Sequence, residues 1–280
     1  MPADELRART RRGKDASVIK AQRIVLVLVL VTAVAGCTSG RSAADHGAAP
    51  SSTPATSAVP TPTPTPTPKT SASPTVPPVS AKARAAGLID IRTIIPDAII
   101  DLRYATTNNF TKLRLYPIGA RCLVHQSMAR GLTVAANRLR QEGYRIVFWD
   151  CYRPHSVQIR MFRIVPNPNW VAKPGPYAYS HEAARSVDIT VAYATVGHTC
   201  AAAQRVQHHC LLDMGTAFDD FTPRAYAFAT AGVGPVARAH RALLRTAMNA
   251  GGITVYLGEW WHFDGPGSDV RRLILDVPLT

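Results

Sequence analysis

Two short segments of this sequence carry imidazole and carboxylate groups at spacings that suit metal chemistry. In the first, His181 and Asp188 lie seven residues apart at the entrance to a β-like run. In the second, Glu259 and His262 are three residues apart and follow another apolar run. A catalytic zinc ion takes three protein ligands of nitrogen or oxygen type and keeps one open position. His181, Asp188 and His262 meet that count, which leaves the carboxylate of Glu259 free to act as a base.

The strand predicted over residues 186–191 would position the first segment. Three aliphatic residues alternate there with Ser186, Asp188 and Thr190, so a strand places Asp188 on the face opposite the aliphatic row. His181 precedes this strand in a polar turn, which can fold the imidazole back toward Asp188. Each segment alone also fits a simpler interpretation. The first could be a turn cap or surface pair, and the second a solvent-facing edge with two core tryptophans.

Taken together, these segments resemble the D-alanyl-D-alanine dipeptidases, zinc enzymes related to the D,D-carboxypeptidases that trim peptidoglycan stems. That family has Trp-Asp-x-Tyr-Arg-Pro, then Ser-His-x-x-Gly-x-Ala-x-Asp, then Glu-Trp-Trp-His. Residues 149–154, 180–188 and 259–262 correspond to these three patterns. Residues 101–111 and 214–219 match two further blocks of the family, in the same order along the chain.

The resemblance departs from the family pattern at two positions. Ala184 stands where the family has Gly, and Ser186 stands where it has Ala. If the backbone at position 184 requires a positive φ, Ala184 strains the turn and the placement of His181 is affected.

The resemblance implies an amide hydrolase with one zinc ion per domain. His181, Asp188 and His262 would hold the metal, and Glu259 would accept a proton from water and pass it to the leaving amine. Arg153 would lie beside the scissile carbonyl and stabilise the oxyanion. A structural pairing of Arg153 with Asp150 is the alternative.

Recognition of a free ammonium group close to the scissile bond would distinguish a dipeptidase. The resemblance assigns this role to Asp219, with Tyr104 beside it, although both could equally be ordinary core or turn residues. The competing enzyme hypothesis is a D,D-carboxypeptidase acting on peptidoglycan stem peptides, which have no free amine at that position. A hypothesis of another class is a catalytically inactive lipoprotein that binds the cell wall, and the intact ligands and base argue against it.

Residues 1–36 have the pattern of an export signal. Seven basic residues precede an uncharged apolar run from Ile24 to Ala35, which is too short to span a bilayer comfortably. The run ends in Val34-Ala35-Gly36-Cys37, which looks like a bacterial lipobox. We expect Cys37 to be lipidated and to anchor the protein on the outer face of the cytoplasmic membrane, in the cell envelope. An ordinary signal peptide is the alternative.

Residues 37–83 are rich in Pro, Thr and Ser and hold almost no large apolar side chains. Such a segment cannot bury enough surface to offset its ordering entropy, and its prolines favour an extended spacer. We therefore expect a disordered tether here, followed by a catalytic domain over residues 84–280.

Periodicity within that domain predicts a mixed fold. Helical spacing favours helices over residues 124–141 and 236–249, and apolar runs favour strands within 88–102, 144–149 and 253–257. This order predicts a single α+β domain, with helices packed on a mainly antiparallel sheet. The family fold agrees, and it implies a zinc site in a central cleft.

Four cysteines remain once Cys37 is set aside. In an exported protein this even number suggests two disulfides, for which three connectivities are possible. We favour a local bridge between Cys200 and Cys210, with Cys122–Cys151 as the other. The alternative is a second zinc site in the His- and Cys-containing segment 198–210.

The formal charge of +14 does not indicate nucleic-acid binding. The basic residues are scattered, seven of them lie in the signal, and no aromatic-basic motif is present. A surface suited to an anionic cell envelope is the simpler interpretation. The function expected from the sequence is thus zinc-dependent hydrolysis of D-alanyl-D-alanine outside the cytoplasmic membrane, in the turnover of cell-wall peptides.

Overall fold

The computed structural model describes residues 76–280. The expected signal, Cys37 and most of the expected tether lie outside these residues. The last part of the segment assigned to the tether is already packed, because α2 (Ala81–Ala85) begins inside it and Ala83 is buried. Within the described part of the chain, no helix has both the length and the apolar character needed to cross a membrane.

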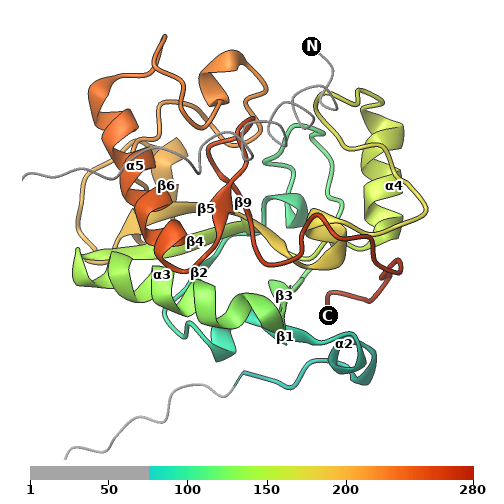
Figure 1. Cartoon of the computed structure of the whole chain (residues 1–280). Coiled ribbons are helices and arrows are strands. Elements are labelled where there is room, and N and C mark those ends of the chain that lie inside the picture. Colours follow the sequence, from blue (N-terminus) through green and yellow to red (C-terminus); the bar gives the residue numbers. More distant parts are fainter. Residues whose placement is uncertain (1–75) are drawn as a thin grey trace, which may run out of the picture. The chain divides into compact units, whose positions relative to one another are not determined.

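A five-stranded sheet lies at the centre of the domain. Its strand order is β2-β4-β5-β9-β8, and β2 and β4 form the one parallel pair. The bounds are β2 (Ile99–Ile100), β4 (Tyr144–Asp150), β5 (Ser186–Tyr193), β8 (Thr254–Val255) and β9 (His262–Asp264). The predicted α+β fold with a mainly antiparallel sheet is therefore confirmed (Figure 1).

Two smaller antiparallel pairs accompany this sheet. β1 (Leu88–Asp90) pairs with β3 (Leu123–His125), and β6 (Arg205–Val206) pairs with β7 (His209–Cys210). Cys210 of β7 forms one disulfide with Cys200, which precedes β6, and Cys122–Cys151 is the other. Both favoured bridges are thus present, and neither Cys200 nor Cys210 is left to bind a metal.

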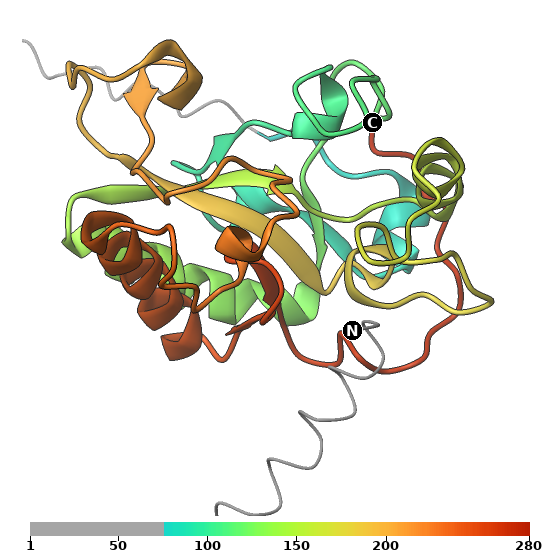
Figure 2. The same cartoon turned by 90° about the horizontal axis from the view of Figure 1, so that it is seen from above.

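Helices α3 (Ala129–Gln141) and α5 (Pro235–Ala250) pack on each other at one side of the sheet (Figures 1 and 2). Their backbones come so close that a Cβ atom on Gly131 would overlap the carbonyl oxygen of Gly251. A Cβ atom on Gly251 would likewise overlap the carbonyl oxygen of Gly131. Glycine at both positions therefore permits this helix contact.

Two helices differ from the expectation. The helix predicted from residue 124 begins only at Ala129, because residues 123–125 pair with β1 instead. In addition, α4 (His155–Ile164) starts after Pro154, where no helix was expected, and it lies apart from α3 and α5 (Figure 1).

Strand β5 is enclosed on both faces. Its residues from Ser186 to Ala192 are buried, so the polar residues that alternate with the aliphatic ones are covered as well. Thr190 on the polar face lines one cavity together with Trp149, Phe218 and Trp260. Asp188 consequently lies in a protein-lined environment, and its charge must be balanced there.

Candidate active site

Strand pairing brings three functional side chains into one row across the sheet. Asp188 of β5 is the register partner of Asp150 in β4 and of His262 in β9. An irregularity in β4 between Phe148 and Asp150 sets this pairing. Two of the three residues predicted to hold the metal thus face each other through sheet geometry.

His181 joins this row from the 3-10 turn Ser180–Ala183, directly before β5. The turn ends at Ala184, which has φ 56° and ψ 28°, so this position is in the left-handed region. The family glycine at this position therefore has a conformational reason, and Ala184 adopts the same conformation. The carbonyl oxygen of Ala184 accepts a hydrogen bond from the backbone of His125 at 2.8 Å, which holds the turn in place.

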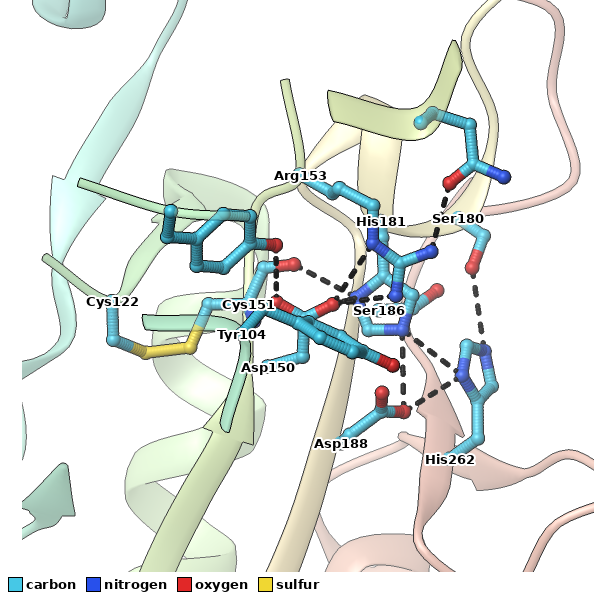
Figure 3. Close-up of polar contacts among 12 residues, drawn as sticks. Tyr104, Cys122, Asp150, Cys151, Arg153, Ser180, His181, Ser186, Asp188 and His262 are labelled. Carbon is cyan, nitrogen blue, oxygen red and sulfur yellow. Dashed lines mark hydrogen bonds and ion pairs between the residues drawn. A yellow bond between two sulfur atoms is a disulfide. The ribbon is translucent and has the colours of Figure 1, made fainter. Parts of the chain in front are cut away.

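Three ligand atoms meet at this point, as Figure 3 shows. His181 Nε2 lies 3.2 Å from Asp188 Oδ1 and 3.1 Å from His262 Nδ1. The remaining side of the triangle, between Asp188 Oδ1 and His262 Nδ1, is 3.0 Å. In a tetrahedral zinc site with bonds of about 2.0–2.1 Å, ligand atoms lie about 3.3 Å apart. The observed triangle is close to that size.

Hydrogen bonds behind the triangle orient both imidazoles. His181 Nδ1 lies 2.8 Å from the carbonyl oxygen of Cys151, which can only accept, so this nitrogen carries a proton. His262 Nε2 lies 3.3 Å from Asp264 Oδ1 and from Ser180 Oγ, where the carboxylate favours a donating N–H. With a metal ion bound, the other nitrogen of each ring would present its lone pair to the triangle, which is the arrangement that a metal ion requires.

The electrostatics of the triangle favour a bound positive charge. Burial would raise the pKa of Asp188, but His181 and His262 hold it below its usual value. Burial would also lower the pKa of His262, yet Asp264 and Asp188 raise it well above its usual value. These three residues consequently fit a divalent cation by donor type, spacing and charge.

Glu259 lies beside the triangle in the turn between β8 and β9. Its Oε2 is 3.9 Å from His262 Nδ1, which is beyond hydrogen-bonding distance. Its side chain is 24 % exposed, so water can reach it, yet burial of the carboxyl raises its pKa to about 7. A carboxylate with this pKa is suited to accept a proton near neutral pH.

Arg153 is held by contacts on two sides. Its Nε and Nη2 donate to Asp150 Oδ2 at 3.1 and 2.6 Å, so the structural pairing considered for this residue is present. Nη1 donates to Gln158 Oε1 at 2.8 Å, and Tyr116 OH donates to Asp150 Oδ1 at 2.6 Å. Burial lowers the pKa of Arg153, but Asp150 more than offsets this effect, so the guanidinium remains charged.

The guanidinium of Arg153 also extends toward Tyr104 and Asp219, the two residues predicted to recognise the substrate ammonium group. It lies over the ring of Tyr104, with the guanidinium carbon 5.2 Å from the ring centroid. Tyr104 OH donates to Asp219 at 3.2 Å, and the backbone N–H of Phe110 also donates to this carboxylate at 3.4 Å. Burial and the charges of Asp188 and Glu259 raise the pKa of Asp219 well above its usual value. Asp219 is therefore a half-buried carboxyl whose charge interacts with Asp188 of the triangle and with Glu259.

Several residues of the site were not predicted as functional. Tyr116 and Gln158 give no signal in the sequence, because only tertiary packing brings them to Asp150 and Arg153. Asp264 could have been identified, since residues two apart in a strand share one face and His262 lies two residues before it.

Comparison with known proteins agrees with the geometry. The family model described as D-ala-D-ala dipeptidase matches residues 84–280. The D-alanyl-D-alanine dipeptidase of Escherichia coli (strain K12) is 31% identical over 189 residues, which make up 68% of this chain and 90% of that protein. The enzyme of the same name from Enterococcus faecalis is 26% identical over 58% of this chain and 83% of its own length. A third, from Streptomyces coelicolor, is 26% identical over 64% of this chain and 92% of its own length. This chain therefore belongs to the D-Ala-D-Ala dipeptidase family, and it is a hydrolase of the metallopeptidase type.

Proposed function

We propose that this protein hydrolyses D-alanyl-D-alanine to two D-alanines with the help of one zinc ion. The observation that carries the proposal is the position of the Tyr104–Asp219 pair beside Arg153. Arg153 pairs with Asp150, whose Oδ2 lies 3.6 Å from Nδ1 of His181 in the triangle. The free ammonium group of a dipeptide could thus pair with Asp219, while the scissile carbonyl close to it would lie beside Arg153 and the metal ligands.

His181, Asp188 and His262 would hold the metal, which supplies Lewis acidity when it is bound. Glu259 accepts the proton of the attacking water and returns it to the leaving amine. Arg153 faces the reacting carbonyl as a fixed positive charge, because Asp150 and Gln158 leave it little freedom to turn. The negative charge that develops on the carbonyl oxygen is thereby stabilised.

The carboxylate of Asp219 recognises the substrate ammonium group. In the free protein, burial and nearby carboxylates raise the pKa of Asp219, and an ammonium group would reverse this effect by pairing with the ionised form. Aromatic rings surround this end of the site. Phe110 packs edge-on against Phe221 at 5.2 Å, and Phe221 stacks on Trp170 at 5.1 Å.

Hydrolysis of stem peptides by a D,D-carboxypeptidase is the second candidate, since it would use the same metal ligands. The half-buried Asp219 favours the dipeptide, because an acylated substrate would place an uncharged amide beside this carboxyl and leave it without a cation.

The test compares D-Ala-D-Ala, N-acetyl-D-Ala-D-Ala and a pentapeptide stem, with released D-alanine as the measured product. We expect turnover of the dipeptide and little turnover of the two substrates without the free amine. Preferred turnover of the stem would support the carboxypeptidase instead.

The cellular setting is part of the proposal and depends on the sequence. We propose residues 1–36 as an export signal, Cys37 as the lipidated residue and residues 37–83 as a tether to the outer face of the cytoplasmic membrane. The catalytic domain would then act on peptides released during cell-wall turnover. Metabolic labelling with a palmitate analogue tests this point, because Cys37→Ser should abolish the label.

A further inference from the structure

Cys151 is covalently bonded to Cys122, and its carbonyl oxygen is also the hydrogen-bond partner of His181. We propose that the Cys122–Cys151 disulfide is a positioning element for the metal ligand His181. The inference depends on the proposed function, since it takes His181 to be a ligand. Figure 3 shows the bridge and the imidazole on either side of residue 151.

The hydrogen bond from His181 determines how the ring presents its other nitrogen. Nδ1 donates to the Cys151 carbonyl oxygen at 2.8 Å, and Nε2 is the atom that faces Asp188 and His262. A shift of the carbonyl therefore turns the ring and moves Nε2 out of the triangle. The partners behind metal ligands typically affect metal affinity by about 10–100-fold.

The backbone that carries this carbonyl lies just beyond the end of β4, in residues 151–154, which form no helix or strand. Cys151 N–H donates to the side chain of Asp150, and Tyr152 N–H donates to the carbonyl oxygen of Leu123 at 2.8 Å. Arg153 N–H donates to the carbonyl oxygen of His181 at 3.1 Å. The segment and the His181 turn thus hold each other in place, and the disulfide adds a covalent restraint at the residue that contacts the imidazole.

The other end of the bridge is itself fixed. Cys122 directly precedes β3, and its carbonyl oxygen accepts from the backbone of Ile91 at 3.0 Å. Each cysteine is 1% exposed, and their Cα atoms are 5.3 Å apart. Cys151 occupies the variable position of the pattern Trp-Asp-x-Tyr-Arg-Pro, so the bridge adds to the family site at a position that the pattern leaves free.

The second disulfide provides a matched control. Cys200–Cys210 links β7 to the segment before β6, and its two sulfur atoms lie beside the carbonyl oxygens of Gln204 and His198. Both bridges restrict the unfolded chain, so loss of either lowers stability. Only loss of Cys122–Cys151 should change the metal site.

The experiment uses the full chain with Cys122→Ser/Cys151→Ser or with Cys200→Ser/Cys210→Ser. Zinc dissociation constants are measured by competition with a chelator, and the Nδ1 proton of His181 is followed by NMR in the zinc-loaded protein. We expect the first variant to bind zinc about 10–100-fold more weakly and to show a shifted or lost proton signal. The control should keep the wild-type affinity and signal.

If the first serine variant does not fold, Cys122→Ala/Cys151→Val carries the same test, because its apolar side chains refill the buried space. Wild-type zinc affinity and an unchanged proton signal in a folded variant without the bridge would overturn this inference and leave the proposed function standing. A wild-type protein that binds no zinc would overturn the proposed function, and the inference with it.

Discussion

Asp188 and His262 face each other across β5 and β9, with Asp188 Oδ1 3.0 Å from His262 Nδ1. Their separation is set by strand pairing, whereas His181 reaches the same point from a turn. Two of the three predicted ligands thus lie on paired strands, and this arrangement favours a fixed geometry before a metal binds.

Loss of one imidazole should abolish metal binding. We expect His181→Ala and His262→Ala to fold and to retain less than about a tenth of the wild-type zinc, because an open tetrahedral site with two protein ligands binds weakly. Elemental analysis after gel filtration measures the zinc content per protein molecule. His198→Ala, at an exposed histidine, is the control and should retain one equivalent. Stoichiometric zinc in either of the first two variants would show that the ligand assignment is incorrect.

Glu259→Gln should separate catalysis from metal binding. Glutamine has nearly the shape of glutamate but cannot accept the proton, so kcat should fall by about 10²–10⁴-fold. Zinc content should not change, because Glu259 lies outside the triangle. Steady-state kinetics and elemental analysis on the same sample give both values. Near-normal turnover would place the base elsewhere, and loss of zinc would make Glu259 a ligand.

Asp219→Asn should weaken recognition of the substrate amine. An interaction with a charged group is worth about 1.5–3 kcal/mol, so kcat/KM for D-Ala-D-Ala should fall by about 10–150-fold. The low turnover of N-acetyl-D-Ala-D-Ala should not fall further, since that substrate has no ammonium group. Asp220→Asn is the neighbouring control, because the Asp220 carboxylate lies 3.8 Å from Arg224 and accepts a hydrogen bond from the backbone of Thr222. Equal losses for both substrates would argue against an ammonium site.

Gly131→Ala should destabilise the domain without touching the site. The added methyl group would overlap the backbone of Gly251, and overpacking of this kind costs about 1–3 kcal/mol. For a domain of this size, each kcal/mol lowers Tm by about 2–4 °C. Gly175→Ala is the control, since it has a negative φ and open space around the new Cβ. Equal Tm values for the two variants would mean that α3 and α5 can separate easily.

Ala184→Gly tests the departure from the family pattern. Relief of the left-handed backbone should contribute about 1–2 kcal/mol. Loss of a buried methyl group costs about 0.8 kcal/mol. The greater freedom of glycine in the unfolded chain costs about 0.5–1 kcal/mol. These effects nearly cancel, so urea unfolding should give a stability within about 1 kcal/mol of wild type. A much larger gain would mean that Ala184 strains the His181 turn.

Local patterns predicted the parts of the fold and site that depend on few distant contacts. The alternation around Asp188 identified β5, and helical periodicity with a following Gly pair identified α5 almost to its ends. The start of α3 was predicted too early because residues 123–125 are also compatible with a helix. Their pairing with β1, more than thirty residues away, decides the outcome.

The same limit applies to the site. Spacing and family pattern indicated His181, Asp188, His262 and Glu259, and the structure brings the first three together. The support for Arg153 could not be predicted, because Gln158 comes from a helix that the sequence did not indicate and Tyr116 from an irregular loop. Such side chains become neighbours only when the whole domain packs.

The register of β9 against β5 also has a consequence for folding. Side chains alternate between the faces of a strand, so a slip of one residue would turn His262 away from Asp188. Only correctly paired chains would then offer all three ligand atoms, and a bound ion would stabilise those chains alone. Zinc present during refolding should therefore increase the fraction of chains with the native β5–β9 register. The same three residues would then serve both catalysis and the selection of the correctly paired sheet.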